Sequence, residues 1–236
     1  MRNFCLLVSV VFSLVLVEGK AQDTGLQGSE AALAHANGMV ERMGGASLWK
    51  NMTYVKFQHV WHPVNRESYV EDEIIDLVEI RSWVRMKSEV FDRTRAYSEA
   101  HGYWSLLNGE LSQGNESSLE NALKRGPYNI YRLLRAIANN SVDYELRIGE
   151  SIVRGGTALD IYYKGEAGGT IVVNARNEPL VWETKQYKYT FGPLKKYGNL
   201  YHPAWAVYNN GAFTYEMVSL NGFNDALDAE LFAPPG

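Results

Sequence analysis

The chain has 236 residues, of which 46% are hydrophobic, 21% charged and 12% aromatic, and its formal net charge is −4. These values exclude a disordered chain, a fibrous repeat and a multi-pass membrane protein. The 23 basic residues do not outnumber the 27 acidic ones, so we expect no nucleic-acid partner, because phosphates require a basic excess. The length suits one domain, since all-β sandwiches and barrels often reach roughly 200–250 residues.

Residues 1–21 have the pattern of a secretory signal peptide. Arg2 gives a positive start, Phe4 to Val17 is an uncharged apolar run, and the small residues Gly19 and Ala21 precede the cleavage point. The run is shorter than the ~20 residues that a bilayer-spanning helix needs. We therefore predict export to the periplasm or the extracellular space, with an uncleaved membrane anchor as the alternative.

The rest of the chain, residues 22–236, contains no cysteine, because Cys5 in the apolar run is the only one. Disulfides, a Cys-ligated zinc site and a cysteine nucleophile are thereby excluded from it. We predict that residues 22–236 form a single domain held together by its hydrophobic core.

Three sites, Asn51, Asn115 and Asn139, match the N-glycosylation pattern. They would be used only in a eukaryotic secretory pathway, and the sequence does not identify the type of organism.

The first element after the leader is a predicted helix over residues 29–43. Ser29 is placed to cap its start, and its alanine, methionine and valine residues recur at helical spacing along one stripe. Gly44 and Gly45 should end this helix, since a left-handed backbone conformation favours glycine.

Strands are predicted next. Residues 53–61 alternate between large apolar and polar side chains, and residues 67–107 contain several further strands. Residues 71–79 are acidic and residues 81–95 basic, so neighbouring strands carry opposite charges. We expect both sets of charges to lie on a solvated face. The dipeptide Asn108-Gly109 indicates a tight turn.

The middle of the chain is predicted to be two consecutive helices. Ser117 with Glu120 matches a capping box at the start of the first. Pro127 suits the first turn of the second, residues 128–139, and Asn139-Asn140 should end it. Its apolar stripe consists of Ile130, Leu133, Leu134 and Ile137.

A second run of strands follows. The alternation predicts strands at residues 142–148, 159–163, 170–173 and 181–191. Asn210-Gly211 predicts a hairpin between two further aromatic-rich strands.

No established catalytic or metal-binding motif is present, so we predict neither a cofactor nor a metal site. His59 and His62 are three apart on a strand and should face opposite sides, and His202 next to a proline is interpreted as structural. Glu71 and Glu73 share a strand face, but in an acidic, solvated run their pKa values should not be tuned for acid–base chemistry.

The order of elements resembles that of LolA, LolB and the wider lipoprotein-sorting-like superfamily of exported proteins. Two short motifs carry the resemblance, MGGASLW at residues 43–49 and AELFAPP at residues 229–235. The resemblance implies an α+β fold: a strongly curved antiparallel sheet, or half-open β-barrel, with one N-terminal helix and two mid-chain helices plugging the concave side. In these families the cavity holds acyl chains or other lipidic molecules.

The functional prediction is an exported, non-catalytic carrier or binding protein for a lipid-like or other apolar ligand, such as an acyl chain. Contact with a membrane surface is left open, and the oligomeric state is not predicted. A filled barrel core with no room for a ligand is the structural alternative. The candidate ligand-binding residues are Phe57, Trp61, Trp83, Trp182, Leu134 and Ile137.

Two other functions remain open. One is an exported enzyme with an unrecognised polar site, and the other is an interaction module of the cell envelope. The enzyme hypothesis requires two or three of the following residues to meet in a cleft: His59, His101, His202, Glu71 and Glu183.

Overall fold

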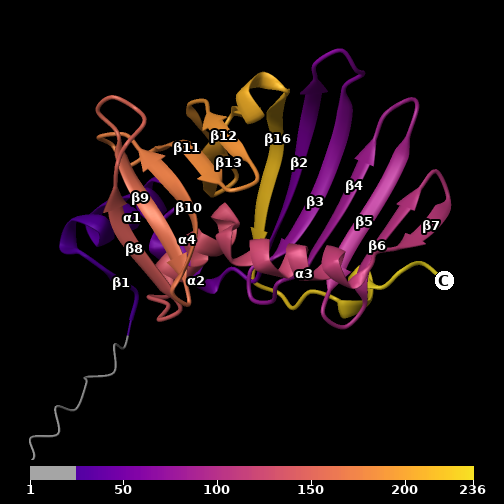
Figure 1. Cartoon of the computed structure of the whole chain (residues 1–236), viewed down its shortest axis with the longest axis horizontal. Helices are drawn as coiled ribbons and strands as arrows, with labels where there is room; N and C mark the ends of the chain where they lie inside the picture. Colours follow the sequence, from indigo (N-terminus) through magenta and orange to yellow (C-terminus); the bar gives the residue numbers. More distant parts are fainter. Residues whose placement is uncertain (1–24) are drawn as a thin grey trace, which may run out of the picture.

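The computed structural model of the protein describes residues 25–236 (Figure 1). The predicted signal peptide, residues 1–21, and its alternative as a membrane anchor lie outside the described residues. Within residues 25–236, none of the helices is both long and apolar enough to cross a membrane.

The elements alternate between a run of strands, two helices and a second run of strands. The helices are α1 (Glu30–Arg42), α2 (Ala46–Asn51), α3 (Glu116–Arg125) and α4 (Ile130–Ala138). The strands of the first run are β1 (Gln27–Gly28), β2 (Tyr54–Pro63), β3 (Tyr69–Asp76), β4 (Ser82–Lys87), β5 (Asp92–Ser98), β6 (Gly102–Leu107) and β7 (Glu110–Gln113). The strands of the second run are β8 (Tyr144–Gly149), β9 (Thr157–Tyr163), β10 (Glu166–Val173), β11 (Pro179–Thr184), β12 (Lys188–Phe191), β13 (Leu194–Tyr197), β14 (Leu200–Pro203), β15 (Trp205–Tyr208) and β16 (Phe213–Phe223).

Fourteen strands of the described chain form one curved sheet in the order β1-β8-β9-β10-β11-β12-β15-β16-β2-β3-β4-β5-β6-β7, and β13 and β14 form a separate pair. All neighbours in the large sheet are antiparallel except β1 and β8. The two edges, β1 and β7, do not pair with each other, so the barrel is half open. The predicted α+β class and curved antiparallel sheet are confirmed.

The pairing of β16 with β2 joins the two runs of strands in the middle of the sheet. The chain leaves the first run at the β7 edge, crosses through α3 and α4, and enters the second run at β8 (Figure 1). In this crossing α3 lies against β5 and β6, and α4 packs against α1 and α2. The crossing therefore places helices over the concave side of the sheet.

The predicted N-terminal helix is confirmed, with one addition. The Ser29 hydroxyl accepts a hydrogen bond of 3.2 Å from the backbone nitrogen of Ala32 and caps α1. Gly44 and Gly45 have φ values of +134° and +94°, which favour glycine and end the helix. The short helix α2, which carries the buried Trp49, was not predicted.

The mid-chain helices are present, but their starts differ from the prediction. Asn115, and not Ser117, caps α3: its side chain accepts a hydrogen bond from the backbone nitrogen of Ser118. Pro127 lies in a separate 3₁₀ turn, and α4 begins after a second asparagine cap, Asn129. An asparagine oxygen can bind the free N–H groups of a first turn as well as serine does, so the cap position was misassigned.

The predicted long strand over residues 181–191 is wrong, because the chain turns between β11 and β12. The Thr184 hydroxyl accepts hydrogen bonds from the backbone nitrogens of Gln186 and Tyr187, at 3.2 and 3.3 Å. This side-chain-to-backbone bonding stabilises a turn in the polar segment 183–186, between the apolar residues of β11 and those of β12.

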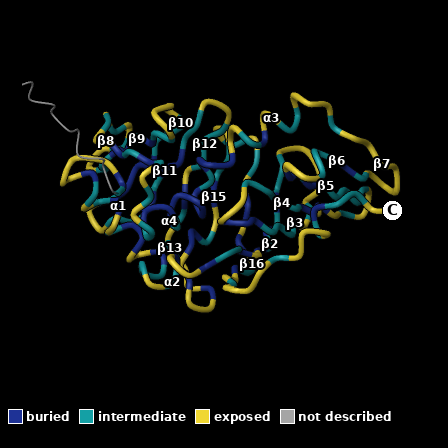
Figure 2. The backbone as a smooth tube through the Cα atoms, turned by 90° about the horizontal axis from the view of Figure 1, so that it is seen from below, coloured by how far each residue is buried: buried dark blue, intermediate teal, exposed yellow. Residues whose placement is uncertain are grey.

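The core lies between the helices and the concave face. Figure 2 shows buried segments gathered along the middle of the molecule, around α4, β15 and β2, and exposed segments at the periphery. Leu133 and Leu134 of α4 are fully buried in this core. A smaller cluster lies on the outer face, where Phe232 near the C-terminus packs on Trp104, whose indole nitrogen donates to the Phe232 carbonyl at 2.7 Å.

Candidate ligand-binding cavity

The concave side of the sheet contains a cavity of about 480 Å³, hereafter the inner cavity. Its walls come from β2–β6 on one side and from β11, β12, β15 and β16 on the other, and α3 and the start of α4 complete them. The aromatic lining comprises Trp61, Tyr69, Tyr97, Tyr103, Trp182, Tyr187, Tyr189, Tyr208 and Phe213. A cavity of this volume falls within the range of small-molecule sites.

A smaller cavity of about 80 Å³ adjoins the inner cavity toward the core. The two cavities share the acidic residues Glu71 and Glu73 and the indole of Trp182. The smaller cavity adds two buried histidines, His59 and His202. The boundary between the two cavities is therefore polar.

Strand pairing brings acidic and basic side chains onto the same inner face. Across β3, β4 and β5, Glu73 lies opposite Val84 and Val84 lies opposite Arg95. Residues that are directly opposite on neighbouring strands point to the same side of the sheet. Glu73 and Arg95 are thus two strands apart on the cavity wall.

The prediction that Glu71 and Glu73 lie in solvent is wrong, and so is the prediction that the pKa of Glu73 is not tuned. Glu71 is 6% exposed, and the indole nitrogen of Trp61 donates a hydrogen bond of 2.8 Å to its carboxylate. Burial, reinforced by the negative charge of Glu71, raises the pKa of Glu73 to about 8. At neutral pH the Glu73 carboxyl group is therefore mostly protonated.

Successive side chains of a strand point to opposite faces of the sheet, so each charged run has an inward-pointing half and an outward-pointing half. Asp72, between the two glutamates, points outward, where the Gln58 amide donates to it at 3.0 Å. Arg85 also points outward and forms an exposed ion pair with Asp92. The expected solvated charges on neighbouring strands are thus present, but they are only the outward half of each run.

Arg95 keeps its charge although it is half-buried on the cavity wall. Burial lowers the pKa of its guanidinium, but the carboxyl groups of Glu71 and Glu73 and the hydroxyl of Tyr103, which hydrogen-bonds to it, together outweigh this effect, so the pKa lies above its usual value. The ion pairs within 4.0 Å in residues 25–236 do not include Arg95. Its positive charge is compensated only at longer range.

The two histidines of the smaller cavity are held among aromatic rings. His59 stacks on Tyr215 with ring centroids 4.1 Å apart, and its Nδ1 lies 3.7 Å from the Glu71 carboxylate. Burial, together with the proximity of His59, lowers the pKa of His202 to about 3. The imidazole of His202 is therefore neutral at physiological pH, as a structural histidine would be.

Three buried nitrogen atoms at this end of the cavity have no hydrogen-bond partner within residues 25–236. They are both ring nitrogens of His59 and the indole Nε1 of Trp182. Buried polar groups are nearly always paired, so unpaired ones beside a cavity indicate where ligand atoms or water would bind.

The structure separates the predicted ligand-binding residues into three groups. Trp61 and Trp182 line the inner cavity, and Phe57 lines the smaller one. Leu134 and Ile137 of α4 are buried in the core and line neither cavity.

Trp83 is the one candidate on the wrong side of the sheet. It packs on the outer face against the cluster of Ala96, Trp104 and Phe232. Its neighbour Val84 points into the inner cavity instead, so the phase of the β4 alternation was misassigned.

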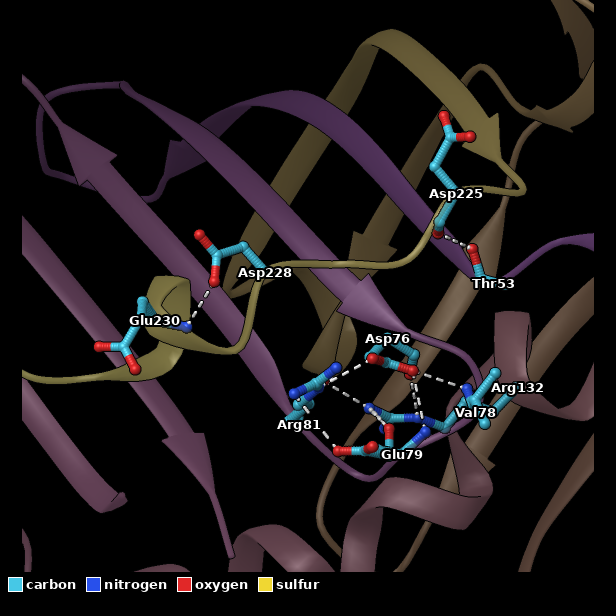
Figure 3. A network of polar contacts seen from close by, with 9 residues as sticks. All are labelled: Thr53, Asp76, Val78, Glu79, Arg81, Arg132, Asp225, Asp228 and Glu230. Atoms are coloured by element: carbon cyan, nitrogen blue, oxygen red, sulfur yellow. Dashed lines mark hydrogen bonds and ion pairs between the residues drawn. The ribbon is translucent and has the colours of Figure 1, made fainter. Parts of the chain in front are cut away.

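Arg132 of α4 lines the inner cavity, and its guanidinium lies beside the end of β3 and the loop that follows it (Figure 3). Its guanidinium donates to the backbone carbonyls of Asp76, Glu79 and Arg81 at 2.8, 3.3 and 2.7 Å. It also donates to the Gly126 carbonyl at 3.1 Å. These four bonds fix α4 and the turn before it against the β3–β4 loop.

The sequence contained a signal for the missed polar residues. Tyr69 and Ile75 occupy the same alternating positions as the two glutamates, and both are bulky residues suited to an inner face. The shared phase of Tyr69, Glu71, Glu73 and Ile75 indicates an inward-pointing carboxyl pair. Arg95 is two residues from Tyr97 on the same strand, so both side chains point to the inner face.

Neither a protein-family model nor a curated protein sequence matches the chain. Among solved structures, the chain superimposes on the crystal structure of a LolA superfamily protein from Nitrosomonas europaea with a TM-score of 0.49 and 9% sequence identity. The superposition covers 86% of this chain and 97% of that one. It is a likeness of fold only, and the functional inference depends on the cavity itself.

Proposed function

We propose that the protein is an exported carrier or binding protein that holds a lipid-like or other apolar ligand in the inner cavity without altering it chemically. The observation that carries this proposal is the open volume of about 480 Å³ behind an aromatic wall. A filled barrel would leave no such volume, and a surface module would not need one. Export is proposed from the signal-peptide pattern of residues 1–21.

The size of the cavity suits a single long chain better than a small polar molecule. Each buried methylene contributes about 0.8 kcal/mol, so a chain of roughly fourteen contributes about 11 kcal/mol. After an association cost of at least about 4 kcal/mol, affinity in the micromolar range remains. Short or polar ligands would need many paired hydrogen bonds to reach the same value.

The proposal is tested by filling the cavity. Met86 lines the inner cavity, and its neighbour Lys87 points outward and is exposed. We expect wild-type protein to bind an uncharged naphthylamine dye with enhanced fluorescence. Met86→Trp should weaken dye binding at least about tenfold, because the larger ring occupies ligand volume. Lys87→Trp, which adds the same ring outside, should bind as the wild type does.

Two outcomes would contradict the proposal. One is a wild-type protein that binds neither the dye nor any long-chain lipid. The other is equal dye binding by wild type and Met86→Trp while Lys87→Trp loses it, which would place the apolar site on the outer face. Circular dichroism of both variants confirms that they are folded.

A second candidate function is favoured by one specific observation. Three of the residues named for an enzymatic site, His59, His202 and Glu71, meet in the smaller cavity, while His101 and Glu183 line neither cavity. A histidine beside a carboxylate can act as a general base. However, the 3.7 Å separation of His59 and Glu71 is longer than a hydrogen bond.

Turnover distinguishes the two functions. Incubated with a fluorogenic long-chain ester, a carrier returns the ester unchanged. Hydrolysis by the wild type that is abolished in His59→Gln, and kept in the control variant His62→Gln at the surface, would establish the enzyme instead.

A further inference from the structure

The polar end of the inner cavity has more positive than negative charge on its lining. Three arginines, Arg95, Arg125 and Arg132, line the cavity together with two carboxyl groups, those of Glu71 and Glu73. Burial keeps Glu73 mostly protonated at neutral pH, since its pKa is raised to about 8. An anion entering the cavity would therefore meet a net positive environment.

Arg132 and Arg95 differ in how many of their N–H donors are already used. Arg132 already donates to four backbone carbonyls. Arg95 makes no ion pair within 4.0 Å in residues 25–236 and faces the cavity from β5. Tyr103 is a side-chain hydrogen-bond partner of Arg95, but a guanidinium has five N–H donors, so others remain to bind a carboxylate.

The unpaired nitrogen atoms provide an independent observation on the walls of the two cavities. Trp182 is 7% exposed and His59 is 6% exposed, and the indole nitrogen of one and both ring nitrogens of the other lack partners in the described chain. An indole N–H can only donate. The missing partner of Trp182 is therefore a hydrogen-bond acceptor, and Trp182 lines both cavities.

We propose, building on the proposed function, that the ligand is a fatty-acid-like carboxylate whose head is bound by Arg95 and the indole nitrogen of Trp182, with its chain along the aromatic wall. The aromatic wall accounts for the apolar chain. The remaining N–H donors of Arg95 and the unpaired indole nitrogen of Trp182 account for an acceptor-rich, negatively charged head. A cationic head would instead be repelled by Arg95, and the one ionised carboxylate among the described residues of the cavity wall, that of Glu71, already accepts a hydrogen bond from Trp61.

Glu73 makes this binding dependent on pH. The groups that face it are Glu71 from its own strand, Ser82 and Arg95 from β4 and β5, and Tyr131 and Arg132 from α4. Protonated, Glu73 adds no negative charge and can donate a hydrogen bond. Ionised, it repels a carboxylate ligand, so the affinity for the acid should fall as the pH rises through about 8.

The experiment compares three ligands with the same chain: hexadecanoic acid, its methyl ester and the matching primary amine. Each displaces the uncharged naphthylamine dye from wild-type protein at neutral pH. We expect the acid to compete about tenfold or more better than the ester or the amine, the difference that a charge-assisted hydrogen bond provides. If the dye does not bind at all, the proposed function is contradicted. This result is distinct from equal competition by acid and ester, which contradicts only the carboxylate head.

Variants then locate the head. Arg95→Gln should abolish the preference for the acid over the ester, and Arg95→Lys should retain part of it. Arg93→Gln is the matched control: it removes the same charge from the same strand but does not line the inner cavity. Trp182→Phe should weaken acid binding several-fold, while Trp205→Phe on the exposed side should not.

The pH series completes the test. Wild-type affinity for the acid should fall several-fold between about pH 6.5 and about pH 9.5, and the affinity of Glu73→Gln should stay constant. The inference is overturned if the dye binds but acid and ester compete equally, if the amine competes best, or if Arg95→Gln weakens acid and ester to the same degree.

Discussion

Trp61 on β2 donates a hydrogen bond of 2.8 Å from its indole nitrogen to the Glu71 carboxylate on the neighbouring strand β3, and this contact lies inside the barrel. The aromatic ring and the acid thus belong to the same wall of the inner cavity. Burying a carboxylate costs free energy unless it has a polar partner, and a purely apolar cavity would offer none. The bond shows that the concave face is built from paired polar and aromatic groups.

Removing this bond should destabilise the fold. Trp61→Phe keeps an aromatic ring but removes the hydrogen bond to the Glu71 carboxylate, and His59 Nδ1, 3.7 Å away, is too distant to replace it. We expect a loss of about 1–3 kcal/mol in the free energy of unfolding, the cost of an unpaired buried acceptor. Chemical denaturation measures it. Trp205→Phe, at 42% exposure, should change stability by less than about 0.5 kcal/mol.

Leu134 tests the packing of α4. It is fully buried and lines neither cavity, so Leu134→Ala should cost the full ~2–5 kcal/mol of a tightly packed site. Leu134→Asp should cost more, because it buries an unpaired charge. The same two substitutions at Leu111, exposed on the edge strand β7, are the controls in urea denaturation. A Leu134→Asp variant as stable as wild type would show that α4 is solvated and the plugged-barrel arrangement wrong.

Glu73 should make the fold less stable at high pH. Its pKa is raised by burial and by Glu71 from 4.5 to about 8, so the folded chain binds this proton more tightly than the unfolded chain does. The contribution is complete below about pH 4.5 and is lost as the pH rises through about 8. Between about pH 5 and about pH 9, wild type should lose stability relative to Glu73→Gln. Glu216→Gln, on the exposed outer face, should follow wild type at every pH, and a constant difference between wild type and Glu73→Gln would refute the assignment.

Phe232 should hold the C-terminal segment on the outer face. Its ring is fully buried against Trp104, and the Arg81 guanidinium lies 4.7 Å from the ring centroid. We expect Phe232→Ala to cost about 3–5 kcal/mol, measured by thermal or urea unfolding. Val90→Ala, at a position 68% exposed, serves as the control. A loss below about 1 kcal/mol would mean that the segment contributes little to the fold.

Much of the fold could be predicted from local patterns. The cap at Ser29, the glycine pair after α1 and the alternation of β2 each reflect one physical rule that acts over a few residues. The break between β11 and β12 was missed because Trp182, Tyr187 and Tyr189 were assigned to one strand, although the polar residues 183–186 separate them and the Thr184 hydroxyl stabilises a turn there. The helix α2 was missed because six residues are too few for a periodic signal.

The choice of large side chains found part of the aromatic lining of the inner cavity, but the charged residues of the lining were not predicted. Large aromatics at inward positions identified Trp61 and Trp182, but the same criterion selected Trp83, which a distant residue, Phe232, helps to cover on the outer face. The polar residues were assigned to solvent because isolated charges usually lie there. Glu71 and Arg95 are exceptions: Glu71 accepts a hydrogen bond from Trp61 on the neighbouring strand, and Arg95 lies on the same inner face as the two glutamates. Both relationships are known only once the strand register is known.

The most direct test of the account is a crystal structure of the protein with a bromine-labelled long-chain fatty acid. Bromine on the chain gives an anomalous signal that locates the ligand independently of side-chain density. We predict a bromine peak inside the inner cavity, along its aromatic wall, with the carboxylate at Arg95 and the indole nitrogen of Trp182. Bromine found only on the outer face, near Trp83, or an empty cavity at saturating fatty acid, would contradict the proposal that the half-open barrel is a binding site for an apolar ligand.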